Sequence, residues 1–207
     1  MGWLQQCLDT HRSCNEARNQ SPWYPTRLLD VGDVTAESSD VRLILSASET
    51  LIGPYCTLSH CWGHSRFIQL NRDTERSLRS GVSLEQMPKT FREAVLATKR
   101  LGIRYIWIDS LCIAQDNLSD WSREAASMHK VYSNTYCNLS ASASADSSEG
   151  LYRQRQPHTF HPTLVNLCVE GLSSEDSYVR CEVHDRSFWE RKVSECVLNG
   201  RGWVSHY

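Results

Sequence analysis

The stretch KTFREAVLATKRLGIRYIWIDSLCI, residues 89–113, decides the fold because its hydrophobic pattern changes partway along. The first half predicts an amphipathic helix in which Phe91, Ala94, Val95 and Thr98 lie on one face. Thr90 and Glu93 have the spacing of a capping box at its start, and Gly102 suits its end. The apolar run that follows directly is typical of a strand that is buried on both faces of a parallel sheet.

The segments before this stretch indicate further strands. Two runs have the composition of strands, residues 41–48 and 54–61. A more polar region follows them, in which we expect a short helix within residues 71–80.

The segments after it repeat the alternation of helix and strand. A second helix is predicted from Asp120 to Tyr132, with Asp120 or Ser119 as its cap, and a strand within residues 135–144. The order strand, helix, strand, helix, strand predicts right-handed crossovers and an α/β fold with a mainly parallel central sheet.

The two ends of the chain are less regular. Residues 1–40 are expected to form an N-terminal extension, and residues 41–207 a single domain. The extension holds Cys7, His11 and Cys14 at near-helical spacing, but a zinc site needs a fourth ligand and none is nearby, so we predict a short amphipathic helix and no metal. An extended connector with two prolines follows. The C-terminal part, from residue 146, is expected to hold irregular additions with two β-like runs, residues 163–170 and 177–184.

Composition limits the classes of function. Charged residues make up 22% of the 207 residues and hydrophobic ones 40%, as in ordinary globular domains. The net charge of −2 gives no electrostatic case for nucleic acid or an anionic membrane, and no apolar run approaches the roughly 20 residues that span a bilayer. The nine cysteines are scattered and odd in number, which favours buried thiols in a reducing compartment, so we expect a cytoplasmic protein.

Glu124 is placed unusually for a carboxylate. On a helical wheel it falls within the apolar stripe of the second helix, which comprises Trp121, Ala125, Met128, Val131 and Tyr132. An acidic side chain there is costly unless it is paired or lines a polar cavity. Either Glu124 pairs structurally with an arginine such as Arg104, or it faces a cleft beyond the carboxyl ends of the strands.

The segment SHCWG, residues 59–63, ends one strand at that same edge, and Asp109 ends the next. Ser59 or Cys61 as a nucleophile with His60 is disfavoured, because adjacent residues of a strand point to opposite faces. We expect instead a turn that forms a ligand-facing wall beside Asp109 and Glu124.

Three blocks of this sequence resemble, in order, those of the fungal heterokaryon incompatibility (HET) domain. They are YCTLSHCWG at 55–63, LGIRYIWIDSLCIAQDNLSDWSREAASMHKVYSNTYCNLSAS at 101–142, and RGWV at 201–204. The chain differs from the family pattern at His60, where Tyr is usual, and after Trp203, where a Leu-Gln-Glu-like stretch usually follows.

The resemblance implies an effector of fungal regulated cell death. HET domains are considered distant relatives of Toll-receptor-like (TIR) domains, which implies a flavodoxin-like three-layer sandwich. DWSREA, residues 120–125, is then similar to the TIR helix whose Glu cleaves the glycosidic bond of NAD, and that Glu corresponds to Glu124.

The implied activity is an NAD(P) glycohydrolase with Glu124 as the catalytic carboxylate and NAD or NADP as substrate, with no cofactor and no metal. The residues expected to line the substrate are Ser59, His60, Trp62, Gly63, Asp109, Cys112, Gln115 and Trp121. The alternative is a non-enzymatic, self-assembling signalling module in which Glu124 is structural. In both cases we expect a homo-oligomer on activation, and neither nucleic acid nor a membrane span.

Overall fold

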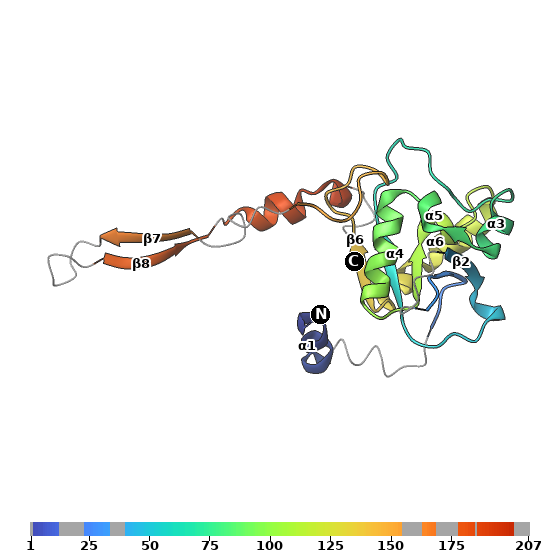
Figure 1. Ribbon diagram of the computed structural model, residues 1–207, viewed down its shortest axis with the longest axis horizontal. Coiled ribbons are helices and arrows are strands. Elements are labelled where there is room, and N and C mark those ends of the chain that lie inside the picture. Colours follow the sequence, from blue (N-terminus) through green and yellow to red (C-terminus); the bar gives the residue numbers. More distant parts are fainter. Residues whose placement is uncertain are drawn as a thin grey trace.

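The computed structural model describes residues 2–12, 23–33, 40–154, 163–168, 178–184 and 186–200, and its central feature is a mixed sheet (Figure 1). In this described part, six strands form one sheet in the order β4-β2-β1-β5-β3-β6. Their bounds are β1 Arg27–Asp30, β2 Asp40–Leu45, β3 Tyr55–Ser59, β4 Val82–Ser83, β5 Tyr105–Ile108 and β6 Cys137–Ser140.

Helices connect and cover these strands. The α-helices are α1 Gly2–Thr10, α3 Glu75–Ser80, α4 Lys89–Arg100, α5 Asp109–Cys112 and α6 Leu118–Ser133. Shorter helical turns are 3₁₀ at Ser46–Ser48, Leu84–Gln86 and Val197–Gly200, and a π-type turn at Glu190–Ser194. None of the described helices is long and apolar enough to cross a membrane.

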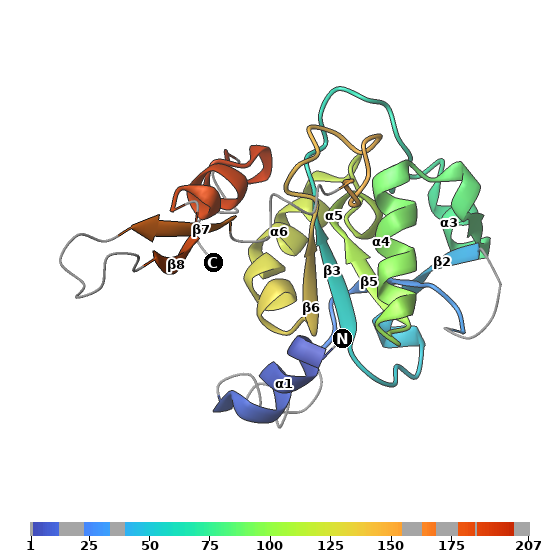
Figure 2. The ribbon, with the colours of Figure 1, turned by 60° about the vertical axis from the view of Figure 1, so that its left-hand side comes forward.

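The strands β5, β3 and β6 form the parallel half of the sheet. The connection from β3 to β5 passes through α3 and β4 and ends with the helix α4, and the connection from β5 to β6, on the far side of β3, ends with α6. Because the two crossovers run in opposite directions, the right-handed rule places α4 and α6 on opposite faces, and Figure 2 shows the two helices on either side of these strands. The prediction of parallel strands is confirmed for these three.

The prediction of a mainly parallel sheet is wrong, because β1, β2 and β4 add an antiparallel half. Among the described strands, β1 pairs antiparallel with both β2 and β5, and β2 pairs antiparallel with β4. The strand β1 lies where the sequence indicated an extended connector, yet Leu28 and Leu29 are fully buried. A four-residue strand between prolines and a polar segment gives too weak a pattern to be predicted.

The ends of the long helices differ from the predicted caps. Thr90 and Glu93 do not cap α4; Thr90 Oγ1 accepts a hydrogen bond from Gly150 N at 3.0 Å, and Glu93 Oε2 accepts one from Leu151 N at 2.6 Å. The two residues therefore anchor the loop that follows β6. The stop at Gly102 is confirmed, because this glycine has a φ of 75°.

The cap of α6 is also different. Asn117 Oδ1 accepts hydrogen bonds from Ser119 N at 3.1 Å and Asp120 N at 3.2 Å, so neither Ser119 nor Asp120 is the cap. This frees the Asp120 carboxylate for partners from other elements.

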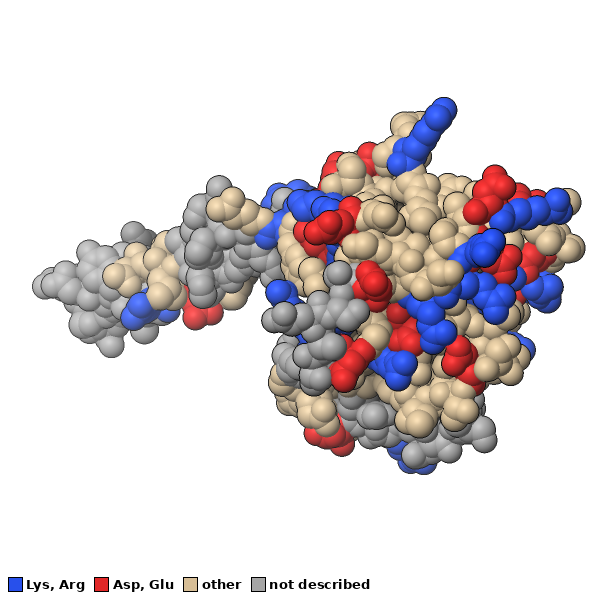
Figure 3. All heavy atoms as spheres, turned by 45° about the vertical axis from the view of Figure 1, so that its right-hand side comes forward, with Lys and Arg blue, Asp and Glu red and all other residues tan. Residues whose placement is uncertain are grey.

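A hairpin of β7 (Thr163–Cys168) and β8 (Tyr178–Val183) projects from the body in Figure 1 and matches the two β-like runs predicted there. On the face of the molecule shown in Figure 3, acidic and basic side chains are intermixed, in keeping with the small net charge. Cys14 and the RGWV block lie outside the described residues.

Candidate functional site

The parallel strands β3, β5 and β6 end at one edge of the sheet, where the sequence predicts a site. In register, Leu58 lies opposite Ile108, and Ser59 opposite Ser140. Asp109 follows Ile108 directly, so Ser59, Asp109 and the segment after Ser59 share this edge. The antiparallel strand β1 begins there too, with Arg27.

Asp109 fixes the segment that follows β3. Its Oδ2 accepts a hydrogen bond from Trp62 Nε1 at 3.0 Å, and its Oδ1 accepts one from Ser110 N at 2.7 Å. His60 Nδ1 lies 3.8 Å from Oδ1 of the same carboxylate. The His60 ring is 2% exposed and meets the ring of Phe91 edge-on at 5.0 Å. Asp109 therefore holds the indole of Trp62 in one orientation at the edge of the sheet.

Ser59 and Gly63 contact the strand and loop on the β6 side. Ser59 Oγ donates to Asn138 Oδ1 at 3.2 Å. Gly63 has a φ of 62°, and a side chain there would clash with Asp146 and lie 2.9 Å from Ala145 O. The loop after β6 thus packs directly on Gly63, which the sequence predicts to line the substrate.

Glu124 is buried on α6, with 4% of its surface exposed. Arg123 donates to Glu124 Oε1 from both Nε and Nη2 at 3.2 Å. Among the described residues, Glu124 Oε2 has no hydrogen-bond donor. The arginine suggested by the sequence, Arg104, instead forms a two-bond pair with Asp30 at the other end of β1, at 2.9 and 2.8 Å.

Sequence reasoning missed a second buried carboxylate, Asp120, one helical turn before Glu124. Arg27 donates to both of its oxygens, at 3.0 and 2.9 Å, and Arg123 Nη2 donates to its Oδ1. Ala114 N donates to Oδ2 at 2.9 Å. Burial opposes ionisation of Asp120, but the hydrogen bonds from Arg27 and Ala114 and the charges of Arg27 and Arg123 outweigh it and lower its pKa.

Trp121 does not occupy the buried stripe in which the sequence placed it. Its side chain is 49% exposed, and that of Leu118 is 79% exposed. The buried face of α6 instead includes Asp120, Glu124 and Val131. Arg27 pairs with Asp120 and Arg123 pairs with Glu124, so neither buried carboxylate is left without a positive partner. The i, i+4 spacing of Asp120 and Glu124 was the sequence signal for this face.

Cys112 lies buried at the end of α5. Burial raises the pKa of its thiol to about 12; a hydrogen bond with the Ile108 backbone and the charge of Arg27 oppose the rise, and the charges of Asp109 and Glu124 add to it. Gln115 acts on its own loop: its side-chain amide donates to Ile113 O at 2.9 Å, and its backbone N–H donates to Leu70 O at 2.8 Å. The edge thus combines an oriented indole, two aspartates, Glu124 and two arginines.

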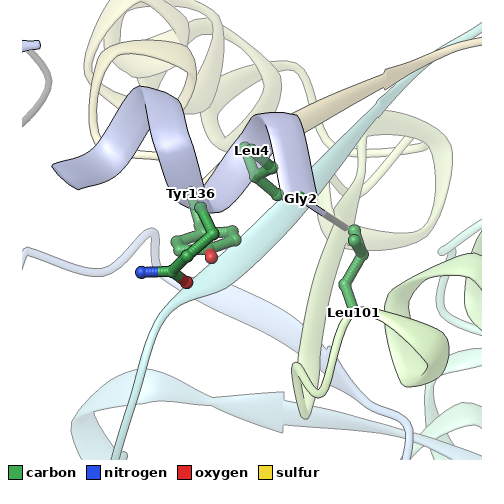
Figure 4. Close-up of a pocket in the computed structure, with 5 residues that line it drawn as sticks. Gly2, Leu4, Leu101 and Tyr136 are labelled. Carbon is green, nitrogen blue, oxygen red and sulfur yellow. The ribbon is translucent and has the colours of Figure 1, made fainter. Parts of the chain in front are cut away.

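A cavity of about 330 Å³ lies elsewhere, against α1 (Figure 4). Its lining residues are Gly2, Leu4, Gln5, Leu101 and Tyr136. Leu101 and Tyr136 precede β5 and β6, so this cavity is at the edge where the parallel strands begin, and none of its lining residues carries a carboxylate. No cluster of three or more metal-ligating side chains occurs among the described residues.

Comparison with known proteins gives one match. A family model described as heterokaryon incompatibility protein (HET) matches residues 55–206, which include β3, β5, α6 and β6 but not β1 or β2. No curated protein and no solved structure matches the chain.

Proposed function

The chain belongs to the heterokaryon incompatibility family, and from this we propose that it is an effector of fungal regulated cell death that hydrolyses the nicotinamide glycosidic bond of NAD or NADP. The observation that carries the enzymatic part is Glu124. It is a carboxylate buried on α6 beside the carboxyl ends of the parallel strands, with Oε1 bound to Arg123 and Oε2 without a donor among the described residues.

The reaction breaks the bond between the ribose C1′ and the nicotinamide nitrogen. Nicotinamide leaves as a neutral ring with the bonding electrons, and the ribose passes through an oxocarbenium-like state. Water then adds at C1′ and loses a proton, which gives ADP-ribose from NAD. The Glu124 carboxylate stabilises the positive charge that develops on the ribose, and burial strengthens that interaction.

The other side chains at this edge bind the substrate in the proposal. Trp62 is oriented by its bond to Asp109, and its indole offers a flat face for the nicotinamide or adenine ring. Ser59 can hydrogen-bond a ribose hydroxyl. The loop packed on Gly63 closes the β6 side of the edge.

The test is release of nicotinamide from NAD and NADP by the purified, concentrated chain, measured by chromatography. Glu124→Gln keeps the size of the side chain but removes its charge, so release should fall about 100-fold or more. Glu75→Gln on α3, which removes a half-exposed carboxylate paired with Arg79, serves as the control and should retain full activity. A Glu124→Gln variant with undiminished release would refute the catalytic assignment.

A second candidate is a non-enzymatic module that signals by self-assembly. The exposed Leu118 and Trp121, three residues apart at the start of α6, favour it because they offer apolar surface for another copy. Concentration-dependent assembly that is lost in Leu118→Glu, with no nicotinamide release from the wild type, would favour this candidate over the enzyme.

A further inference from the structure

Arg27 comes from β1, outside the residues that match the family, yet its guanidinium reaches the start of α6. We propose that Arg27 is a positioning residue for Glu124: it satisfies the charge of Asp120, so that Arg123 can hold the Glu124 carboxylate in place. The proposal rests on the proposed function, because it concerns the carboxylate that carries the reaction.

The first step of the argument is the distribution of hydrogen bonds. Asp120 receives two bonds from Arg27 and one from Ala114 N, and shares Arg123 with Glu124. Arg123 therefore donates to two carboxylates. The hydrogen bonds that it can give to Glu124 depend on how many Asp120 receives from Arg27 and Ala114 N.

The second step is the balance of charge. With Arg27 present, two buried carboxylates one helical turn apart face two guanidinium groups. Without Arg27, the same carboxylates would share Arg123 alone. Arg123 already donates to both carboxylates, and Asp120 would then have no other guanidinium, so Arg123 would be drawn toward Asp120 and Glu124 would lose its donor. The groups that α5 adds nearby are the Cys112 thiol and the Asp109 carboxylate, and neither supplies a positive charge.

The third step is geometry. Arg27 Nη1 also donates to Cys112 O at 3.0 Å, where α5 ends. A single guanidinium thus joins β1, the end of α5 and the start of α6. The Arg27 side chain is 15% exposed, so solvent screens its pair with Asp120 only weakly. Lysine carries the same charge but cannot form the two parallel bonds.

Arg104, the residue just before β5, supplies a control on the other side of β1. It forms the same kind of two-bond pair with the buried Asp30, but at the opposite end of β1. Replacing either arginine by methionine removes one guanidinium from one buried aspartate. Arg104 is 54% exposed and Arg27 only 15%, so the loss of Arg27 should cost more stability. Activities are therefore compared at a temperature where urea unfolding shows both variants to be fully folded, so that a difference in kcat reflects the site and not the unfolded fraction.

The experiment compares Arg27→Met, Arg27→Lys and Arg104→Met in the full chain by two measurements. The first is steady-state nicotinamide release. We expect Arg27→Met to lower kcat at least tenfold, with KM changed less than threefold. Arg27→Lys should recover part of kcat, and Arg104→Met should retain it.

The second measurement is the NMR signal of the Arg123 Nε–H group, assigned with Arg123→Lys. It should lose its protection from exchange in Arg27→Met and keep it in Arg104→Met.

The outcomes separate the two proposals. If Arg27→Met and Arg104→Met give the same kcat, or if Arg123 Nε–H stays protected in Arg27→Met, the positioning role is overturned. If wild type releases no nicotinamide, the proposed function fails, but the NMR comparison still decides whether Arg27 controls the contact of Arg123 with Glu124. If Arg27→Met does not fold, Arg27→Lys is judged by the same two measurements, with reduced kcat and reduced protection expected.

Discussion

Asp30 lies buried at the end of β1 and accepts three hydrogen bonds, two from Arg104 and one from Gly32 N at 2.9 Å. Burial opposes its ionisation, but the hydrogen bonds from Arg104 and Gly32 and the charges of Arg104 and Arg42 outweigh it, so its pKa is lowered. A carboxyl group whose pKa is lowered by folding stabilises the protein above its unfolded pKa of about 4. That stabilisation is lost as the pH falls through the folded-state pKa.

Asp30→Asn should therefore be less stable at pH 7 by about 1 kcal/mol, at the lower end of the usual range because Arg104 is 54% exposed and solvent screens it. The deficit should shrink as the pH falls from about 4 to about 2, because the wild type then loses the same contribution. Urea unfolding of both proteins at several pH values checks this. If the unfolding free energies of the two proteins, plotted against pH, ran parallel across this range, the stabilising role of the Asp30 carboxylate would be contradicted.

At the residue scale, the helical wheel predicts the burial of Glu124 correctly and that of Trp121 wrongly, and it does not identify their partners. The wheel places Glu124 on the inner face of its helix, and the side chain is 4% exposed. The ion pair of Glu124 with Arg123 could not be predicted, because in our proposal it depends on Arg27. Arg27 lies 96 positions before Arg123 in the sequence, on the strand β1, which the sequence pattern did not reveal. A carboxylate on an apolar stripe indicates that a partner exists, but only the fold determines which one.

At the element scale, Gly63 shows how the end of β3 and the loop after β6 depend on each other. Gly63→Ala would force a φ of 62° on alanine and push its Cβ against Asp146. We expect a loss of about 2–4 kcal/mol, from backbone strain plus overpacking, and faster hydrogen exchange in residues 143–153.

Gly53→Ala is the control, because Gly53 also has a positive φ, 91°, but no atom lies within 4 Å of the added Cβ. It should cost only the strain, about 1–2 kcal/mol, and leave exchange in residues 143–153 unchanged. Equal losses in the two variants would mean that the packing of the loop on Gly63 contributes nothing.

The positions of α4 and α6 are predictable from hydrophobic periodicity, whereas their caps are not. Thr90 and Glu93 fit a capping box in sequence, but their oxygens bind backbone groups of residues 150–152. A local motif has to compete with distant donors, and the loop after β6 has three N–H groups that need acceptors. The same loop packs on Gly63, so these anchors also shape the β6 side of the candidate site.

At the scale of the whole molecule, the parallel half of the sheet follows from the order of long, strongly patterned elements. The antiparallel half follows only in part. The strand β2 lies within the predicted run 41–48, but β1 follows two prolines and a polar segment comes after it, and β4 has only two residues, so neither gives a readable pattern. The consequence for function is direct. The missed strand supplies Arg27 and fills the centre of the sheet between β2 and β5.

The family match begins at residue 55, and a domain boundary drawn there or at residue 40 removes β1. A chain that starts at residue 40 loses Leu28, Leu29 and Val31, all fully buried, and leaves β2 and β5 without the strand between them. Each lost core side chain costs about 2–5 kcal/mol, so together they approach the whole stability of a typical domain. We expect this chain to be unfolded or aggregated in circular dichroism and size-exclusion chromatography.

The control is a chain that starts at residue 23, which keeps β1 and loses α1. It should fold, with an unfolding midpoint near that of the full chain. A folded, monomeric chain from residue 40 would show that the matched residues form the sheet on their own, and that Arg27 is dispensable for the arrangement around Glu124.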